Sequence, residues 1–93
     1  MEFEWDQRKA ESNLRRRGVS FHEGASVLAD PLSITYPDPD HSLTEHRFIT
    51  VGVSCVGRVL MVAHTDRGDR IRIISARRAN RHEQEQYRER LRR

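Results

Sequence analysis

The chain has 93 residues, which is enough for one compact domain with a modest core and too few for separate catalytic and regulatory units. Its 17 basic and 14 acidic residues are divided unevenly, because residues 1–46 carry 5 basic and 9 acidic groups (net −4) and residues 47–93 carry 12 and 5 (net +7). A single cysteine excludes an intramolecular disulfide, and the lack of a long apolar run excludes a signal peptide and a membrane-spanning helix, so we expect one cytoplasmic domain over residues 1–93.

A helical hairpin is predicted for the N-terminal third of the chain. Asp6 stands where an N-cap belongs, ahead of a helix that Gly18 would stop. Ser20 and Glu23 form the S-x-x-E capping box of a second helix. This helix must end at the pair Asp30–Pro31, since proline cannot continue a helical ladder. Each helix has a narrow apolar side, so the two should pack as a hairpin.

A mainly antiparallel sheet of four strands is predicted to follow. The strand segments are rich in β-branched residues, and prolines on both sides of the first one place it at a sheet edge. Short connections at Cys55–Gly57 and Asp66–Gly68 join the last three segments as hairpins. Residues 3–5 are either a further short strand or a staple for the first helix. The four predicted strands cover residues 32–36, 47–54, 58–65 and 69–76.

The most informative segment runs from Arg70 to Arg77, where arginine alternates with isoleucine at strand spacing. Asn80 and Glu83 then repeat the capping-box pattern and open a C-terminal helix, whose apolar side is only Tyr87 and Leu91. One sheet face and one helix end therefore become cationic together, which suits an RNA or DNA phosphate backbone. The alternative is a solvated arginine-rich surface with no such partner.

The length of the second hairpin loop decides which of these side chains share a face, because a shift of one residue reverses a strand's faces. A three-residue loop at Asp66–Gly68, closed by glycine in the left-handed region, places Thr65 opposite Asp69. One face of the hairpin is then apolar and should meet the helices. A two-residue loop at Arg67–Gly68 would mix the two faces, so we predict the longer loop. The opposite face then gathers Arg58, His64, Arg70 and Arg72.

Such a face has the groups that RNA cleavage by the 2′-hydroxyl requires: a base, an acid and cations, without a metal ion. Arginine cannot act as the base, so the arginines are predicted to stabilise charge and place the substrate. His64 is the best-placed acid or base, although a strand-end histidine satisfied by a neighbour is the structural alternative. The candidate catalytic residues are His64, Arg47, Arg70, Arg72, Arg77, Glu45 and Tyr87, and the candidate RNA contacts are Arg58, Arg78 and Arg81.

Several of these candidates have equally simple structural roles. Glu45 is a potential loop ion pair, and Tyr87 either offers its hydroxyl or a base-stacking ring, or packs the last helix on the sheet. Glu83 is first of all a helix cap. Asp38 and the residues at 40–41 superficially resemble a metal cluster, but the flanking prolines favour an ordinary solvated turn. No zinc spacing is present, and we predict no cofactor.

The order of these motifs resembles the BrnT family, the toxin halves of bacterial type II toxin–antitoxin pairs. The resemblance covers nearly the whole chain, and its most specific piece is the arginine-flanked strand followed by a capped helix. One departure is that Arg17 stands where many members of that family have histidine before Gly18. The matching pieces are Phe3-Glu-Trp5-Asp6, Lys9, Asn13-Leu14, Gly18-Val-Ser-Phe21, Asp30-Pro31, Glu45 with Arg47, Gly57-Arg58, and Arg72-Ile-Ile-Ser-Ala-Arg77 with Ala79, Glu83 and Tyr87.

The resemblance implies an α+β, RelE-like fold: a small antiparallel sheet with helices on one side. It also implies a metal-independent endoribonuclease that arrests translation, with or without the ribosome. A cognate antitoxin of BrnA type, with a ribbon-helix-helix domain, would neutralise the toxin and contact operator DNA as part of the complex. Two other hypotheses stay open: a non-catalytic nucleic-acid-binding module, and a heterocomplex subunit whose arginines meet an acidic partner helix.

Overall fold

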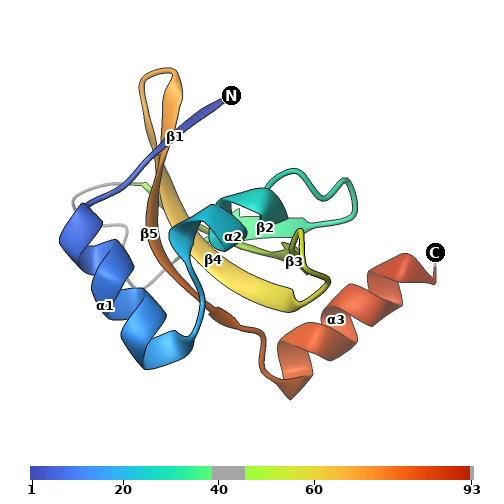
Figure 1. The fold of residues 1–93 in the computed structure, drawn as a ribbon. Coiled ribbons are helices and arrows are strands. Elements are labelled where there is room, and N and C mark those ends of the chain that lie inside the picture. Colours follow the sequence, from blue (N-terminus) through green and yellow to red (C-terminus); the bar gives the residue numbers. More distant parts are fainter. Residues whose placement is uncertain (39–45, 93) are drawn as a thin grey trace.

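A computed structural model describes residues 1–38 and 46–92 and shows an α+β domain with a curved central sheet (Figure 1). The α+β class predicted from the sequence is confirmed. No helix within the described residues has the length and apolar content needed to cross a bilayer. The elements in chain order are β1 (Glu2–Glu4), α1 (Gln7–Arg17), α2 (Phe21–Val27), β2 (Ile34–Pro37), β3 (Arg47–Val53), β4 (Val59–Arg67), β5 (Arg70–Arg78) and α3 (Arg81–Leu91).

The sheet has five strands in the order β1-β5-β4-β3-β2, so the prediction of four strands was wrong by one. The extra strand is β1, which pairs in parallel with the start of β5, whereas the other pairs are antiparallel. The sequence did not decide whether this segment is a strand or a hydrophobic staple for the first helix, because three residues are too few to show a clear alternation of side chains. The predicted position of β2 at an edge, next to prolines, is confirmed.

The helical hairpin forms largely as its caps predict. The Asp6 carboxylate accepts the Lys9 N–H, and Gly18 ends α1 with φ of 71°. Ser20 caps α2 by accepting the N–H of Glu23. The Glu23 carboxylate, however, leaves the cap and bonds instead to the side chains of Ser54 and Arg58 beside β4.

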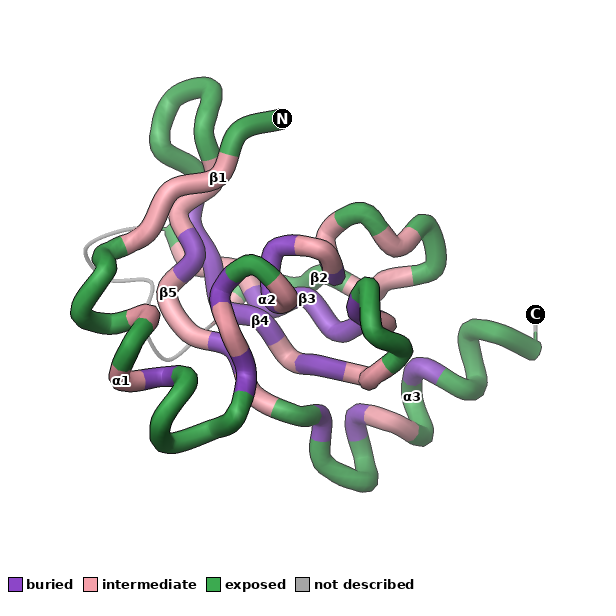
Figure 2. The backbone as a smooth tube through the Cα atoms, viewed as in Figure 1, coloured by how far each residue is buried: buried purple, intermediate pink, exposed green. Residues whose placement is uncertain are grey.

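Helices cover both faces of the sheet, which corrects the expectation that they lie on one side. Helices α1 and α2 pack on a core around Phe21, Leu60 and Ile73, whereas Tyr87 of α3 packs on the opposite face together with Ala79, which precedes the helix. We call these the hairpin side and the α3 side of the sheet. In Figure 1, α3 projects outward from its start at the end of β5, and in Figure 2 most of its length is exposed. The α3 side is therefore only partly covered by its helix.

The predicted register of the β4–β5 hairpin was wrong. Arg67 pairs with Arg70 across the two-residue turn Gly68–Asp69, in which Gly68 has φ of 65°, as a glycine at the first position of a type II′ turn requires. The two faces stay ordered because the register shifts at a β-bulge, where Ala63 pairs with Ser75 but His64 pairs with Ile73. The bulge inserts one residue into β5 and restores the alternation that the shorter loop disrupts.

This register separates the four residues that were predicted to share a face. Arg70 and Arg72 lie on the α3 side, whereas His64 lies on the hairpin side opposite Ile73. Arg58 precedes β4 and bonds to Glu23 and to a backbone carbonyl of the helical hairpin. The expected convergence of arginines around His64 is therefore contradicted by the structure.

Candidate active site

Three arginines form a band across the end of the sheet on the α3 side. Arg47 and Arg72 both pair with Thr65, so the three residues form one row across β3, β4 and β5. Arg70 lies two residues further along β5, where it opposes Arg67. We call Arg47, Arg70 and Arg72 the arginine band. All three were candidate catalytic residues, and the register brings them to one face.

Two members of the arginine band pair with carboxylates of β1. Arg70 lies 3.3 Å from Glu2, and Arg72 lies 3.2 Å from Glu4. Exposed ion pairs of this kind contribute little free energy, since water screens both charges. The side chains of Arg70 and Glu2 are 55% and 69% exposed, so a phosphate can replace the Glu2 carboxylate at little cost in free energy. The pairs link β1 to β5 and leave the guanidinium of Arg70 largely in solvent and that of Arg72 partly so.

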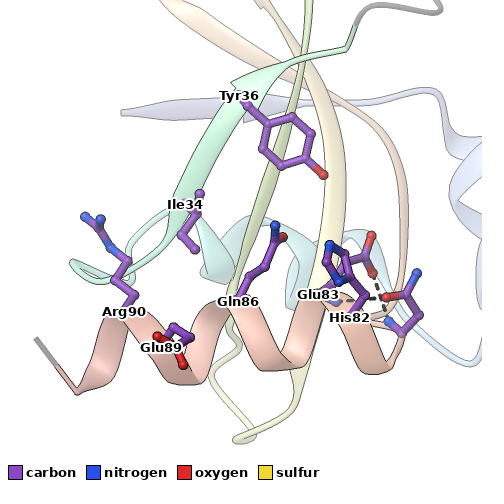
Figure 3. A pocket seen from close by; sticks show the side chains of 8 residues that line it. Ile34, Tyr36, His82, Glu83, Gln86, Glu89 and Arg90 are labelled. Atoms are coloured by element: carbon purple, nitrogen blue, oxygen red, sulfur yellow. Dashed lines mark hydrogen bonds between the residues drawn. The ribbon is translucent and has the colours of Figure 1, made fainter.

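A groove of about 750 Å³ opens on the same α3 side, between the edge strand β2 and helix α3 (Figure 3). The ring of Tyr36 extends from β2 toward the first turns of α3, where His82 and Gln86 lie. The groove thus brings a phenol hydroxyl and an imidazole to one solvent-open space. Its lining residues are Ile34, Tyr36, Asn80, His82, Glu83, Gln86, Glu89 and Arg90.

The base of this groove is fixed by an ion pair between Arg77 and Glu83. Each guanidinium NH2 group donates to a different carboxylate oxygen at 2.8 Å, and the Asn80 N–H donates to the same carboxylate at 2.8 Å. Burial acts to raise the pKa of Glu83, but the bonds from Arg77 and Asn80 outweigh it and lower that pKa. Glu83 is therefore a charged anchor for Arg77 as well as the cap that the sequence predicted.

The Tyr36 hydroxyl keeps its proton at neutral pH. Burial is the main cause that raises the pKa of Tyr36, and the negative charge of Glu83 raises it further. The residue is still 37% exposed, so its hydroxyl is accessible to a ligand in the groove. Tyr36 can thus donate a hydrogen bond or a proton, whereas it is a poor base.

His64 does not reach either of these features. It is 6% exposed, and its Nε2 lies 2.7 Å from Thr50 Oγ1 on the hairpin side of the sheet. Burial lowers the pKa of His64, with only a partial counter-effect from the charge of Asp66. Thr50 satisfies Nε2, as in the structural alternative of a strand histidine bonded to a neighbour, whereas the buried Nδ1 has no hydrogen-bond partner among the described residues.

The comparison with protein families decides what kind of protein this is. A family described as the ribonuclease toxin, BrnT, of type II toxin–antitoxin systems matches residues 5–83. The chain belongs to the BrnT family. The resemblance inferred from the motif order is thereby confirmed, and with it the broad class of ribonuclease toxin.

A solved member of the BrnT family shares the fold. The crystal structure of the Brucella abortus ribonuclease toxin, BrnT, superposes with a TM-score of 0.69 over 87% of this chain and 99% of that one, at 20% sequence identity. Searching the curated proteins by sequence finds no match. Membership of a type II family implies an RNA substrate and an antitoxin partner.

Two further candidates of this BrnT-family chain, Tyr87 and Arg58, have structural partners. Tyr87 is 5% exposed, and its hydroxyl donates to Asp30, so it packs α3 on the sheet as the simpler alternative proposed. Burial and the bond to Asp30 raise the pKa of Tyr87 to about 12. Arg58 is held by Glu23 on the hairpin side, away from the arginine band.

Arg78 and Arg81 are exposed at the junction between β5 and α3, where contact with RNA stays a prediction. Glu45 lies outside the described residues, as do positions 40 and 41 of the predicted turn. Among residues 1–38 and 46–92, no three His, Cys, Asp or Glu side chains gather so that they could hold a metal ion.

Sequence reasoning missed Tyr36 and His82, the phenol and the imidazole among the residues that line the groove. His82 lies inside the capping-box segment, so its position on the first turn of α3 was predictable. No local signal, however, places α3 beside β2, because the two elements are more than 40 residues apart in the chain. The groove arises only when β2 pairs with the edge of β3 and α3 packs on the face of β3.

Proposed function

We propose that this chain is a metal-independent endoribonuclease that cleaves RNA on the α3 side of its sheet and thereby arrests translation. The observation that carries the proposal is that Tyr36 and His82 line one groove on the face that also bears the arginine band. Membership of a ribonuclease toxin family supports it. Phosphates of the RNA would lie along the arginine band while the scissile bond enters the groove.

The proposed reaction is attack of the 2′-oxygen on phosphorus, with rupture of the bond to the 5′-oxygen. The His82 imidazole, which lines the groove, takes the 2′-proton as the general base. The Tyr36 hydroxyl, which keeps its proton, gives that proton to the departing 5′-oxygen. Arg77, fixed by Glu83 beside the groove, stabilises the charge that builds on the phosphoryl oxygens.

We also propose that a cognate antitoxin of BrnA type, with a ribbon-helix-helix domain, neutralises the toxin in the cytoplasm. The net charge of +7 on residues 47–93 favours an acidic segment of that partner as the inhibitor. Operator DNA would be contacted through the toxin–antitoxin complex. Such an antitoxin would block RNA by covering the arginine band or the groove.

Cleavage of single-stranded RNA in EDTA tests the proposed reaction. His82→Ala and Tyr36→Phe should each lower the cleavage rate by about a hundredfold or more, as loss of an acid, a base or a charge-stabilising donor does. Arg72→Ala should weaken RNA binding. Arg15→Ala, on the exposed surface of α1 across the sheet, is the matched control and should cleave normally.

Each outcome of this assay is informative. Full cleavage by both His82→Ala and Tyr36→Phe contradicts the placement of the reaction in the groove. RNA binding without cleavage by the wild-type chain favours the non-catalytic nucleic-acid-binding module. Loss of cleavage in EDTA, restored by Mg²⁺, contradicts metal independence. Growth arrest after induced expression, relieved in the His82→Ala variant, provides the test in cells.

A further inference from the structure

A second pocket, of about 560 Å³, lies at the end of the sheet that bears the arginine band. This volume falls in the range of small-ligand sites, roughly 300–1,000 Å³. Its position follows from strand lengths, because β4 continues for two residues beyond Thr65, its last residue paired with β3. The pocket is separate from the groove and is lined by His46, Phe48, Thr65, Asp66 and Arg67.

The aromatic wall of this pocket is Phe48, whose ring is stacked on a buried histidine. Phe48 stacks on His64 with ring centroids 6.0 Å apart and an interplanar angle of 26°. His64 is held in turn by Thr50, whose hydroxyl lies 2.7 Å from Nε2 and 2.8 Å from the hydroxyl of Thr35. The buried histidine, which the proposed reaction does not use, therefore positions an aromatic ring at the pocket.

The polar groups of the pocket match a nucleobase. Asp66 and Arg67 are both exposed, and the Arg67 side chain forms no hydrogen bond or ion pair with any residue of 1–38 and 46–92. A guanidinium commonly donates two hydrogen bonds to the O6 and N7 acceptors of guanine, and a carboxylate accepts from base N–H groups. Unpaired RNA bases are held in this way, by a stacked aromatic ring and contacts to the base edge.

The pocket is also placed to act together with the arginine band. Thr65 lines the pocket and lies between Arg47 and Arg72 in the same row of the sheet. Arg67 pairs directly with Arg70. Thr65 and Arg67 face the α3 side with the arginine band, whereas Phe48 and Asp66 face the hairpin side. The pocket therefore wraps the end of the sheet, and a nucleotide whose phosphate lies on the arginine band would place its base around that end.

We infer that this pocket is a nucleobase subsite that binds one unpaired guanine of the RNA beside the arginine band. The inference rests on the proposed function only in taking RNA as the ligand. It assigns sequence preference to Phe48 and Arg67, and it assigns to His64 a positioning role, rather than a catalytic one, behind Phe48.

Binding of uncleavable RNA tests the subsite without depending on catalysis. The probes are U-rich 2′-O-methyl hexamers with a single guanine or adenine, titrated into the wild-type chain and followed by fluorescence anisotropy. The wild type should prefer the guanine probe by about fivefold or more, the range of a bidentate arginine–guanine contact. Arg67→Ala should abolish the preference, and Phe48→Leu should weaken binding of both probes by about fivefold or more.

The matched control is Arg15→Ala, which removes the same charge from α1 on the hairpin side and should retain the preference. Equal binding of the two probes by the wild type, or a guanine preference that survives Arg67→Ala, overturns the subsite. Because these probes lack the attacking hydroxyl, the result is independent of the cleavage assay. A chain that cleaves RNA but binds both probes equally would retain the proposed function and lose the subsite alone.

Discussion

Asn13 substitutes for a missing strand at the outer edge of the sheet. The parallel strand β1 pairs with β5 only as far as Arg72, which leaves the edge of β5 open beyond that residue. There the Asn13 side chain, 4% exposed, donates from Nδ2 to the Ala76 carbonyl at 2.8 Å and accepts the Ala76 N–H at 3.3 Å. The same Nδ2 donates to the Val19 carbonyl at 2.9 Å, which links the helical hairpin to the strand.

Asn13→Ala should therefore destabilise the domain strongly. It removes three hydrogen bonds and leaves the Ala76 N–H and two carbonyls buried without these partners. At about 1 kcal/mol for each bond, the free energy of unfolding should fall by about 3 kcal/mol. For a domain of this size, that corresponds to a decrease in Tm of roughly 12–24 °C. Urea unfolding followed by circular dichroism gives the free energy directly.

Asn13→Asp sharpens the same test, because its carboxylate can accept the Ala76 N–H but must face two carbonyl oxygens. This contact disfavours the charged form and should raise the pKa of the new carboxyl above its unfolded value of about 3.9. The stability of this variant relative to wild type is then largest below the unfolded pKa and is lost as the pH rises through the folded pKa.

The unfolding free energies of wild type, Asn13→Ala and Asn13→Asp at pH 4, 5.5 and 7 check this reasoning. The deficit of Asn13→Asp should grow with pH, whereas that of Asn13→Ala should stay constant, since alanine does not titrate. An Asn13→Asp variant as stable as the wild type at pH 7 would refute the account of the sheet edge.

Three further substitutions test the packing of the groove and of the sheet. Tyr87→Phe removes the hydroxyl bond to Asp30 and should cost about 1.5–3 kcal/mol in urea unfolding. Burial acts to raise the pKa of Asp30, but its hydrogen bonds outweigh burial and lower that pKa. The stability deficit of Tyr87→Phe should therefore shrink as the pH falls through the folded pKa of Asp30. A deficit independent of pH contradicts the bond between Tyr87 and the Asp30 carboxylate. Glu83→Gln removes the ion pair with Arg77, so it should destabilise the domain by about 2 kcal/mol and slow RNA cleavage. An unchanged cleavage rate would show that Arg77 does not need this ion pair to act on RNA. Gly52→Ala places a methyl group 2.9 Å from Asp30 Oδ2 and should cost about 1–3 kcal/mol in thermal unfolding, whereas a wild-type Tm would mean that the neighbouring chain yields freely.

The helices could be predicted from the sequence because their signals are local. Asp6, Ser20 and Asn80 each accept an N–H of the first helical turn, and a residue three or four positions away is sufficient to define such a cap. Gly18 ends α1 for an equally local reason, since its φ of 71° favours glycine. These signals do not depend on the rest of the fold.

The sheet register could not be predicted with the same certainty, because it depends on a bulge. The two-residue turn at Gly68–Asp69 and the bulge after Ala63 compensate each other, and neither produces ordered faces alone. Alternation of side chains, the only signal available in the sequence, is interrupted where the bulge occurs. The error moved His64 to the wrong face while leaving Arg70 and Arg72 together, because both arginines lie on the same side of the bulge.

Helix α3 determines whether the groove exists, and polar contacts hold much of it in place. Its only two buried residues are Glu83 and Tyr87, and each is bonded to a charged partner, Arg77 or Asp30. An element anchored by so little apolar surface opens at a lower free energy than the core does. The groove is therefore the part of the active face whose shape is most easily changed, whereas the arginine band stands on paired strands of the central sheet. A partner that binds α3 can thus alter the groove between Tyr36 and His82 without disturbing the arginine band, which we propose to hold the phosphates.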